Sequence, residues 1–549
     1  MAPENNDERR VPRLEQFDEW TRHRSVAEEQ GRLLAAESGA QVDGVRANAT
    51  AYLSTRLLIS TLIDVEAAIE VLREAARPFD WTVEEDPDYP RITLEESEEE
   101  RRSRVERYPW ATGSLGLARV IIAATQNSPT RPPDAWTLLQ AARASNPEGD
   151  LLRGIGLDHV LTTSPLTRGN PLTRGNPLTR GNPLTRGNPL TRGNPLTRGN
   201  SFAIESYADQ GSGGRQPVAF VGPAPMRSPD DPDAPRRPRI GVVDTGCGEH
   251  TWFTSAVHDG SGLLEGATIG RTDAESDPER VGDVSGPLDG SLDEASGHGT
   301  FIVGLLHQGA PDADIHWWRL LDSDGTTPES DLATVLMQIA KLVRLGDEKG
   351  LALDVLNLSF GYYHETPVDH LFDPTLYEIL AAIGRTGTVV VCSAGNDATT
   401  RPMFPAAFAP WDGAEQIVKH DPRSTPIVAV GALNPNLVTD ALYSNAGPWI
   451  SVHRPGSSLV STMPAFQGGL EPVARIRHGQ RDREAIDPDD FRGGFAVWSG
   501  TSFAAPVYAA ELARRIGRHL PAPDAPALSS EKIVEQNTAI VAKLADARP

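Results

Sequence analysis

The chain has 549 residues, a formal net charge of -23, 39% hydrophobic residues and two cysteines. This length is enough for two or more domains, each with a hydrophobic core of its own. The negative charge argues against a nucleic-acid partner, and two cysteines are too few for a small secreted protein built on disulfides.

The first residues, MAPENNDERRVPRLEQF, alternate in charge and contain no apolar core of the kind found in signal peptides. No run reaches the roughly 20 apolar residues that a membrane-spanning helix requires. We therefore expect a cytoplasmic protein without a membrane partner. Within residues 1–49, apolar residues at helical spacing between positions 9 and 37 predict an amphipathic helical segment.

Residues 50–164 alternate between the periods of strands and helices. The patterns predict a strand, a helix, two further strands, a second helix and a last strand, at residues 51–60, 64–76, 81–85, 115–125, 132–144 and 154–162. A charged helical run at 94–108 interrupts them. Without this insertion the order is βαββαβ, which is typical of an α+β domain of the ferredoxin-like type.

Residues 165–200 consist of the hexapeptide PLTRGN repeated six times without variation. One leucine per six residues offers too little apolar surface for a stacked repeat, and the regular prolines favour turns or extended chain, so we expect a tether. The arginines from Arg168 to Arg198 are candidate cleavage sites for a protease. Residues 201–237 are rich in Gly, Pro and Asp and are predicted to be a flexible linker.

From residue 238 to 520, short apolar runs such as IGVV and TVVVC alternate with helical patterns such as DLATVLMQIAKLVRL. Strands without polar alternation are buried on both faces, and helices between them form parallel crossovers. We predict an α/β domain with a doubly wound parallel sheet, followed by a helical extension at 521–549. Functional residues of such sheets lie beyond the carboxyl ends of the strands.

Three motifs occupy such positions. Asp244 ends the run IGVVD, His298 lies in the segment GHGT, and Ser502 lies in GTSFAAP. An acid, an imidazole and a hydroxyl are the groups needed for nucleophilic acyl transfer. Each motif also has a simpler interpretation, because Ser502 could cap a helix, His298 could merely enter one, and a single Asp-Thr-Gly could belong to a dimeric aspartic protease.

Together, in the order Asp, His, Ser, these motifs resemble the signatures of the subtilisin-like serine proteases, the subtilase family. The resemblance covers residues 238–520 and implies that Asp244 orients His298, which acts as general base for the nucleophile Ser502. The turn SAGN resembles the family segment whose Asn donates to the oxyanion, so Asn396 is expected to have that role. The related sedolisins lack this His and Asn, which disfavours that branch.

The resemblance also implies a substrate-binding groove. Its walls would come from two segments, Leu358, Ser359, Phe360 and Gly361, and Ser393, Ala394 and Gly395. Asp397 follows the oxyanion residue and would either attract a basic substrate or be a solvated turn residue. The acidic loop with Asp273, Glu275, Asp277, Glu279, Asp283 and Asp289 allows structural calcium, but it lacks a fixed ligand spacing, which favours a solvated acidic surface instead. The histidines other than His298, among them His307 and His316, also lack metal-ligand spacing, and no cofactor is required for the expected reaction.

These observations predict a serine endopeptidase that acts on polypeptides through an acyl-enzyme. Subtilases are often preceded by a βαββαβ propeptide, so residues 50–164 are expected to be either a self-inhibitory domain of that type or an unrelated regulatory domain. Two alternatives remain for the function. One is a regulatory or binding module activated by a partner, and the other is a peptide-processing transamidase or macrocyclase, in which an amine intercepts the acyl-enzyme.

Overall fold

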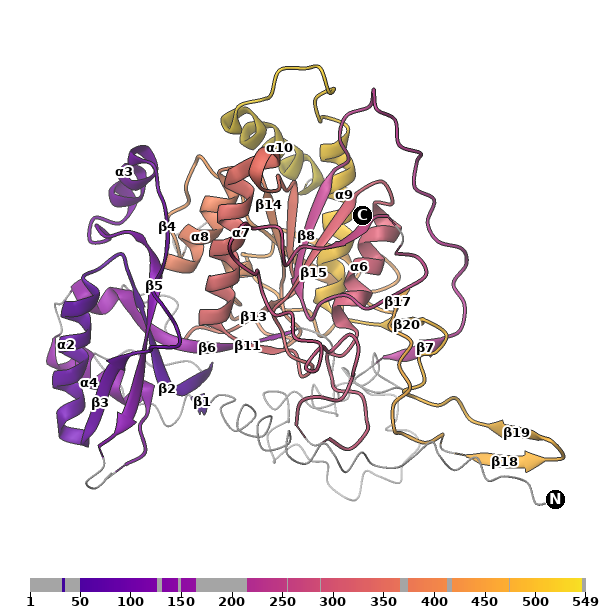
Figure 1. Ribbon diagram of the computed structural model, residues 1–549, viewed down its shortest axis with the longest axis horizontal. Helices are drawn as coiled ribbons and strands as arrows, with labels where there is room; N and C mark the ends of the chain where they lie inside the picture. Colours follow the sequence, from indigo (N-terminus) through magenta and orange to yellow (C-terminus); the bar gives the residue numbers. More distant parts are fainter. Residues whose placement is uncertain are drawn as a thin grey trace.

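The computed structural model describes residues 32–34, 50–125, 131–146, 150–163, 215–253, 255–286, 288–365, 374–411, 417–472 and 474–545. The PLTRGN tether predicted at 165–200 lies outside these residues, as does most of the helical segment predicted at 1–49. We refer to residues 50–163 as the N-terminal domain and to residues 215–545 as the α/β domain (Figure 1).

The α/β domain is built on a seven-stranded sheet of order β16-β15-β14-β12-β8-β10-β9, in which all neighbouring strands are parallel. The strands are β8 (Arg239–Asp244), β9 (Val257–Asp259), β10 (Asp314–Arg319), β12 (Val355–Leu358), β14 (Val389–Ser393), β15 (Val428–Leu433) and β16 (Val452–Pro455). The central strands β12, β14 and β15 are buried along their whole length. The predicted doubly wound parallel sheet is thereby confirmed.

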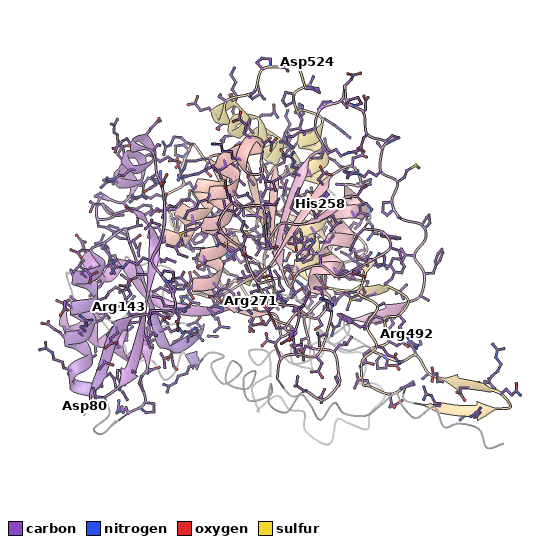
Figure 2. All side chains as sticks on the ribbon, in the orientation of Figure 1. Asp80, Arg143, His258, Arg271, Arg492 and Asp524 are labelled. Carbon is purple, nitrogen blue, oxygen red and sulfur yellow. The ribbon has the colours of Figure 1, made fainter. Side chains whose placement is uncertain are left out.

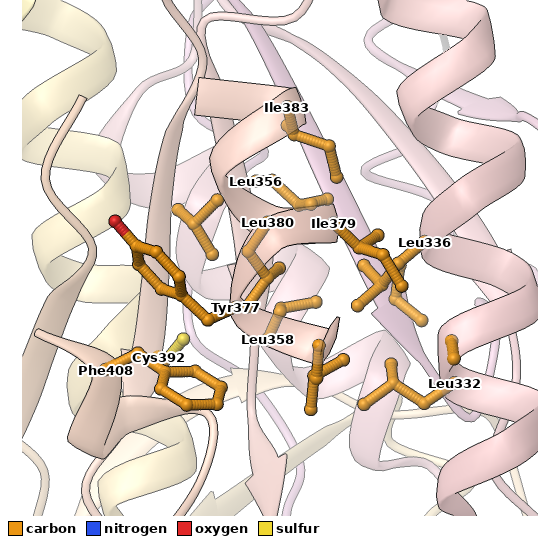
Figure 3. Close-up of a cluster of buried hydrophobic side chains, with 14 of the residues drawn as sticks. Leu332, Leu336, Leu356, Leu358, Tyr377, Ile379, Leu380, Ile383, Cys392 and Phe408 are labelled. Carbon is orange, nitrogen blue, oxygen red and sulfur yellow. The ribbon is translucent and has the colours of Figure 1, made fainter. Parts of the chain in front are cut away.

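Helices cover both faces of this sheet. On one face, α6 (His298–Gly309) and α9 (Thr501–Gly517) pack together, and on the other α7 (Glu329–Lys349) packs against α8 (Thr375–Gly384). Successive strand residues divide between the two faces: Val389 and Val391 join the core of α6 and α9, whereas Val390 and Cys392 join that of α7 and α8. Figure 3 shows the second of these cores, where Ile379 of α8 lies toward Leu336 of α7.

Smaller elements surround the main sheet. A three-stranded sheet contains β17 (Leu459–Thr462), β20 (Phe495–Trp498) and β7 (Gln216–Val218). A hairpin of β18 (Arg475–His478) and β19 (Arg481–Glu484) projects away from the body of the domain (Figure 1). The helix α10 (Ser530–Ala545) follows a connection that includes Asp524, labelled at the top of Figure 2. Its residues Ile540, Val541 and Leu544 belong to the same core as α9.

The N-terminal domain has an antiparallel sheet of order β6-β2-β5-β3. Its elements in chain order are β2 (Thr50–Ser60), α2 (Val65–Ala76), β3 (Trp81–Glu85), β4 (Ile92–Leu94), α3 (Glu98–Arg107), β5 (Leu115–Ala124), α4 (Ala135–Ser145) and β6 (Ile155–Thr163). The helices begin where side chains cap them: Asp64 accepts from the Ala67 amide, and Ser97 forms a capping box with Glu100.

The two domains share one sheet. Strand β6 pairs antiparallel with β11 (Thr326–Pro328) and with β13 (Phe360–Gly361) of the α/β domain. Charged groups join the domains elsewhere. Arg107 lies 2.7 Å from Glu378 of α8, and Glu100 accepts from Arg344 and Arg385 at 2.8 and 2.9 Å. Asp158 accepts from both the amide and the hydroxyl of Ser330, at the start of α7.

Two expectations differ from the structure. Residues Arg32–Leu34, predicted as part of a helix, form the short strand β1, because the N-terminal end of β2 offers backbone groups for pairing and tertiary contacts override local periodicity. The expected linker 201–237 is held to the α/β domain over its described part. There β7 pairs with β20, and Arg236 forms an ion pair with Asp354 at 2.7 Å.

Candidate active site

The residues of the three sequence motifs meet at the carboxyl edge of the parallel sheet. Asp244 is the last residue of β8, and Asn396 follows the end of β14 by three residues. His298 and Ser502 lie in the first turns of α6 and α9, which pack against each other on one face of the sheet. Residues from four distant segments are thus gathered at the edge where open α/β sheets bind their ligands.

Asp244 and His298 form the centre of this site. His298 Nδ1 lies 2.6 Å from Asp244 Oδ1, which also accepts from the Thr245 amide at 2.8 Å. Both side chains are fully buried, and His298 Nε2 has no hydrogen-bond partner among the described residues. A carboxylate bonded to one ring nitrogen fixes the tautomer that leaves the other nitrogen able to accept a proton.

Two glycines allow this close approach. A Cβ on Gly299 would lie 2.0 Å from the carbonyl oxygen of Gly246, in the turn that follows Asp244. Gly297 adopts a left-handed conformation with φ of 84°, and a Cβ there would collide with Met463. Glycine is therefore required at position 299 because a side chain there would separate the loops that carry the acid and the imidazole, and at position 297 because of the left-handed backbone.

Ser502 lies at the N-terminal end of α9, where the helix dipole stabilises negative charge. Its Oγ donates to the carbonyl oxygen of Ser359 at 3.0 Å, and Ser359 Oγ donates back to the Ser502 carbonyl at 2.9 Å. Asn357 Nδ2 in turn donates to Ser359 Oγ at 3.0 Å. These three hydrogen bonds fix the position of Ser502 relative to the end of β12.

The amide of Asn396 is oriented by the residue that precedes the serine. Its Oδ1 accepts from both the backbone amide and the hydroxyl of Thr501, each at 2.9 Å. With the oxygen held in this way, the Nδ2 group, which is the donor, has a defined direction. An amide donor fixed beside a nucleophile is suited to stabilising an oxyanion.

The expected groove residues fall into two groups. The side chains of Leu358 and Phe360 are fully buried in the core of α7 and α8, so only their backbones can contact a substrate (Leu358 is labelled in Figure 3). Ser359, Gly361, Ser393, Ala394 and Gly395 are all buried. Of these, Ser359 is hydrogen-bonded to Ser502, and the Gly395 amide donates to Thr501 Oγ1 beside it. Gly361 is in β13, the strand that pairs with β6.

Sequence reasoning missed Met403. Positions for a Cβ on Gly361 and on Gly395 each lie 2.5 Å from an atom of the Met403 side chain. The methionine is buried and therefore occupies the space between the two walls predicted for the groove. It stands outside the two segments that the family resemblance identified, so no local signal pointed to it.

Glu279 was placed by its sequence in an acidic, solvated loop, but it is buried and contacts the neighbours of Asp244 and His298. It accepts from Thr245 Oγ1 and Thr300 Oγ1 at 2.5 Å and from the Gly299 amide at 3.1 Å. These partners flank Asp244 and His298, so the carboxyl group ties both catalytic loops together. Burial raises the pKa of Glu279 to about 7, although the two threonine hydrogen bonds oppose the shift.

The remaining acidic side chains of this loop do not converge. Asp273 is paired with Arg319, while Asp283 and Asp289 accept from the amides of Gly290 and Ser291. Among the described residues, no group of three or more close metal ligands comes from this loop. Both cysteines are free thiols, and burial raises the pKa of each. Within the described part of the chain, no helix is both long and apolar enough to cross a membrane.

The chain is similar in sequence to known proteins. Residues 236–533 match the model of the subtilase family. The chain is 27% identical over 224 residues to a thermophilic serine proteinase of Bacillus sp. (strain AK1), an alignment that covers 41% of this chain and 45% of that protein. The chain therefore spans about half the length of this curated relative.

Two crystal structures of proteases are also similar. A cold-adapted subtilisin-like serine proteinase has 17% identity and a TM-score of 0.34, covering 58% of this chain and 88% of its own. Fervidolysin from Fervidobacterium pennivorans, described as a keratinolytic enzyme related to subtilisin, has 15% identity and a TM-score of 0.41, covering 91% and 58%. Since the family model matches more than half of its residues, the chain belongs to the subtilase family.

Proposed function

We propose that this protein is a serine endopeptidase that hydrolyses polypeptides through an acyl-enzyme. Ser502 attacks the carbonyl carbon, His298 accepts the serine proton at Nε2, and Asp244 stabilises the resulting imidazolium. The observation that carries the proposal is the 2.6 Å contact between Asp244 and His298, which leaves His298 Nε2 without another partner in the described chain. The tetrahedral intermediate would be stabilised by Asn396 Nδ2 and the Ser502 amide.

We further propose that the N-terminal domain is a ferredoxin-like propeptide domain that inhibits the protease. Its last strand, β6, adds to β11 and β13 as an extended substrate would, with Leu161 opposite Thr327 and Thr162 opposite Gly361. The Thr163 amide also donates to the carbonyl of Gly325 at 2.8 Å. A chain bound in this register points toward the serine and prevents another peptide from entering.

The predicted tether follows this strand directly. Cleavage within residues 165–200, by this protease or by another, would cut the covalent connection between the two domains. The non-covalent contacts of β6 would still hold them together. Release of the N-terminal domain would then be the step that exposes the groove. The arginines from Arg168 to Arg198 remain the proposed cleavage sites.

Replacement of the proposed nucleophile tests the activity. The Ser502→Ala variant should lose hydrolysis and covalent labelling by a serine-directed phosphonate, whereas Ser499→Ala, three residues earlier in the chain, should keep both. The expected loss is on the order of 10⁶-fold in kcat, by analogy with the subtilisin triad. Undiminished hydrolysis or labelling of Ser502→Ala would rule out the assignment.

Intact mass and N-terminal sequencing of the same pair of proteins test maturation. Wild-type chain that becomes two fragments, beside an intact Ser502→Ala chain, supports self-processing. Product masses separate hydrolysis from transamidation, because only a hydrolysed product carries the added mass of water. Labelling that requires a second protein would instead favour the partner-activated module.

A further inference from the structure

Two histidines without a role in catalysis meet at the boundary between the domains. His159 comes from β6 of the N-terminal domain, and His364 follows β13 of the α/β domain by three residues. Glu365 lies beside them, and all three residues are buried. The ligand atoms that they offer lie within 4.8 Å of one another, and this is the one such group found among the described residues.

We propose that His159, His364 and Glu365 form a binding site for a zinc ion that joins the N-terminal domain to the α/β domain. Two imidazoles and one carboxylate are a typical zinc ligand set, whereas calcium and magnesium prefer oxygen ligands alone. Ligands on one zinc ion lie roughly 3–4 Å apart. Glu365 Oε2 lies 3.5 Å from His364 Nδ1 and 2.8 Å from His159 Nε2. The shorter contact is a hydrogen bond in this structure, so a bound zinc ion would take the place of the shared hydrogen.

The surroundings of His159 match those of a metal ligand. Its second ring nitrogen, Nδ1, lies 2.6 Å from Glu329 Oε2, and Glu329 Oε1 accepts from the Tyr362 hydroxyl at 2.7 Å. Histidines that bind metals usually donate their other N-H group to a carboxylate, which fixes the tautomer and directs the free nitrogen toward the ion. Glu329 would be such an orienting partner, with Nε2 of His159 facing the metal.

A small cavity and an unpartnered carboxylate oxygen lie beside the cluster. The cavity, of about 30 Å³, is lined by His159, His364, Glu329 and Tyr362 among others but not by Glu365, and it is large enough for a single ion or water. Glu365 is fully buried, and its Oε1 has no hydrogen-bond partner among the described residues. A buried carboxylate oxygen without a partner is costly, and a bound cation would remove that cost.

Binding of zinc would hold the N-terminal domain on the α/β domain, because one ligand comes from the first and two come from the second. This consequence for activity rests on the proposed function, but the site itself does not. The site can therefore be tested on the full-length Ser502→Ala chain, in which the two domains stay covalently connected and no proteolysis is needed.

Metal content after equilibration with Zn²⁺ and gel filtration is the direct measurement, using untagged protein. We expect one zinc per chain, with proton release on binding as Nε2 loses its hydrogen. His364→Ala and Glu365→Gln should each remove bound zinc, whereas His453→Ala, in β16 of the main sheet, should retain it. Ca²⁺ and Mg²⁺ should not compete.

Two further measurements distinguish loss of the zinc site from misfolding of a variant. Glu329→Gln should keep the one-to-one stoichiometry but weaken zinc affinity by about 10- to 100-fold, as expected for a residue that only orients a ligand. Co²⁺ should give the visible absorption of a four-coordinate site in the parent and not in His159→Ala. Substoichiometric zinc in the folded parent, or equal binding by His364→Ala, would overturn the proposal and leave His159 as a protonated group between two glutamates.

Discussion

The two central sheets of this protein bury their faces in different ways. The parallel sheet of the α/β domain is covered by helices of its own domain, with α6 and α9 on one face and α7 and α8 on the other. The sheet of the N-terminal domain uses its own helices for only one face. Leu57 and Ile59 pack with α2 and α4, whereas Leu58, between them, belongs to the core of α7 and α8.

This difference separates a domain that covers both faces of its own sheet from a domain that needs a partner for one face. Along β5, Val120 faces the internal core of the N-terminal domain, while Leu117 joins the core of the α/β domain. In β6 the change occurs along the strand, because Leu157 lies in the first core and Leu161, four residues later, lies in the second. A sheet with apolar side chains on both faces needs a partner for its second face. The N-terminal domain is therefore built to dock, and β6 is the strand that joins the two environments.

A pair of variants within β6 gives the strongest test of whether the two cores that this strand contacts are independent. Leu161→Ala and Leu157→Ala each remove a fully buried leucine, at an expected cost of about 2–5 kcal/mol. Leu161→Ala should speed hydrogen exchange in β6, β11 and β13, because it loosens docking. Leu157→Ala should instead speed exchange throughout β2, β6 and α2. Both variants are made in the Ser502→Ala chain, and identical exchange patterns would show that the two cores are not independent.

Asn396→Ala tests the chemical side of the comparison. Loss of the oxyanion donor should lower kcat by about 10²- to 10³-fold with little change in KM, as in the subtilisin example of the same effect. The free energy of unfolding should change little, because the substitution only removes one hydrogen-bond acceptor from Thr501 near a helix end. Steady-state kinetics with a peptide substrate make the measurement, with Asn434→Ala on the surface as control.

Retained kcat in Asn396→Ala would mean that the oxyanion is stabilised elsewhere. A rise in KM with unchanged kcat would show that this residue binds the substrate and the transition state equally.

The Glu279→Gln variant tests how the buried carboxyl group of the α/β domain makes stability depend on pH. The pKa of Glu279 in the folded state, about 7, is above its ordinary value of 4.5, so the folded protein holds this proton more tightly than the unfolded chain does. The stabilisation that results is complete below pH 4.5 and is lost as the pH rises to about 7. This loss amounts to about 3 kcal/mol. Glutamine does not ionise, so the difference in unfolding free energy between the variant and its parent should change by that amount across this pH range.

Urea unfolding of the two proteins at several pH values measures this difference, again in the Ser502→Ala background. A constant difference between pH 4.5 and pH 8 would contradict the raised pKa. Asp289→Asn, in the exposed part of the same loop, is the control and should change nothing.

Met403→Ala should have the smallest effect. Removing the side chain between Gly361 and Gly395 enlarges the space beside the serine, so cleavage after large apolar residues should gain relative to cleavage after small ones. The expected change in the ratio of kcat/KM values is about 10- to 100-fold, since pocket contacts of this kind are worth about 1–3 kcal/mol. Profiling with a peptide library measures it, and an unchanged profile would place the specificity pocket elsewhere.

Much of the fold could be predicted because its signals are local. The buried strands β8, β12, β14 and β15 are continuous apolar runs, and the helices between them have clear helical spacing. The short strands β1, β4 and β11 were not predicted, because three residues carry almost no pattern and pair only when a neighbouring strand is available.

The candidate site divides in the same way. Asp244, His298, Asn396 and Ser502 stand in motifs whose flanking glycines and strands reveal them individually. Glu279 and Met403 stand in unremarkable stretches, and the histidines outside the motif were given no role. His159 lies 206 residues from Glu365, and no spacing rule along the chain links them.

The sequence by itself determined the chemistry and the elements, because side-chain type and periodicity act over a few residues. Only the tertiary structure decided which buried residues face each other. Docking of β6 beside β11 and β13 brings His159 to His364 and Glu365, and loop closure around Asp244 buries Glu279. Such meetings depend on strand register and domain packing, which are set by the whole set of buried surfaces rather than by any one segment.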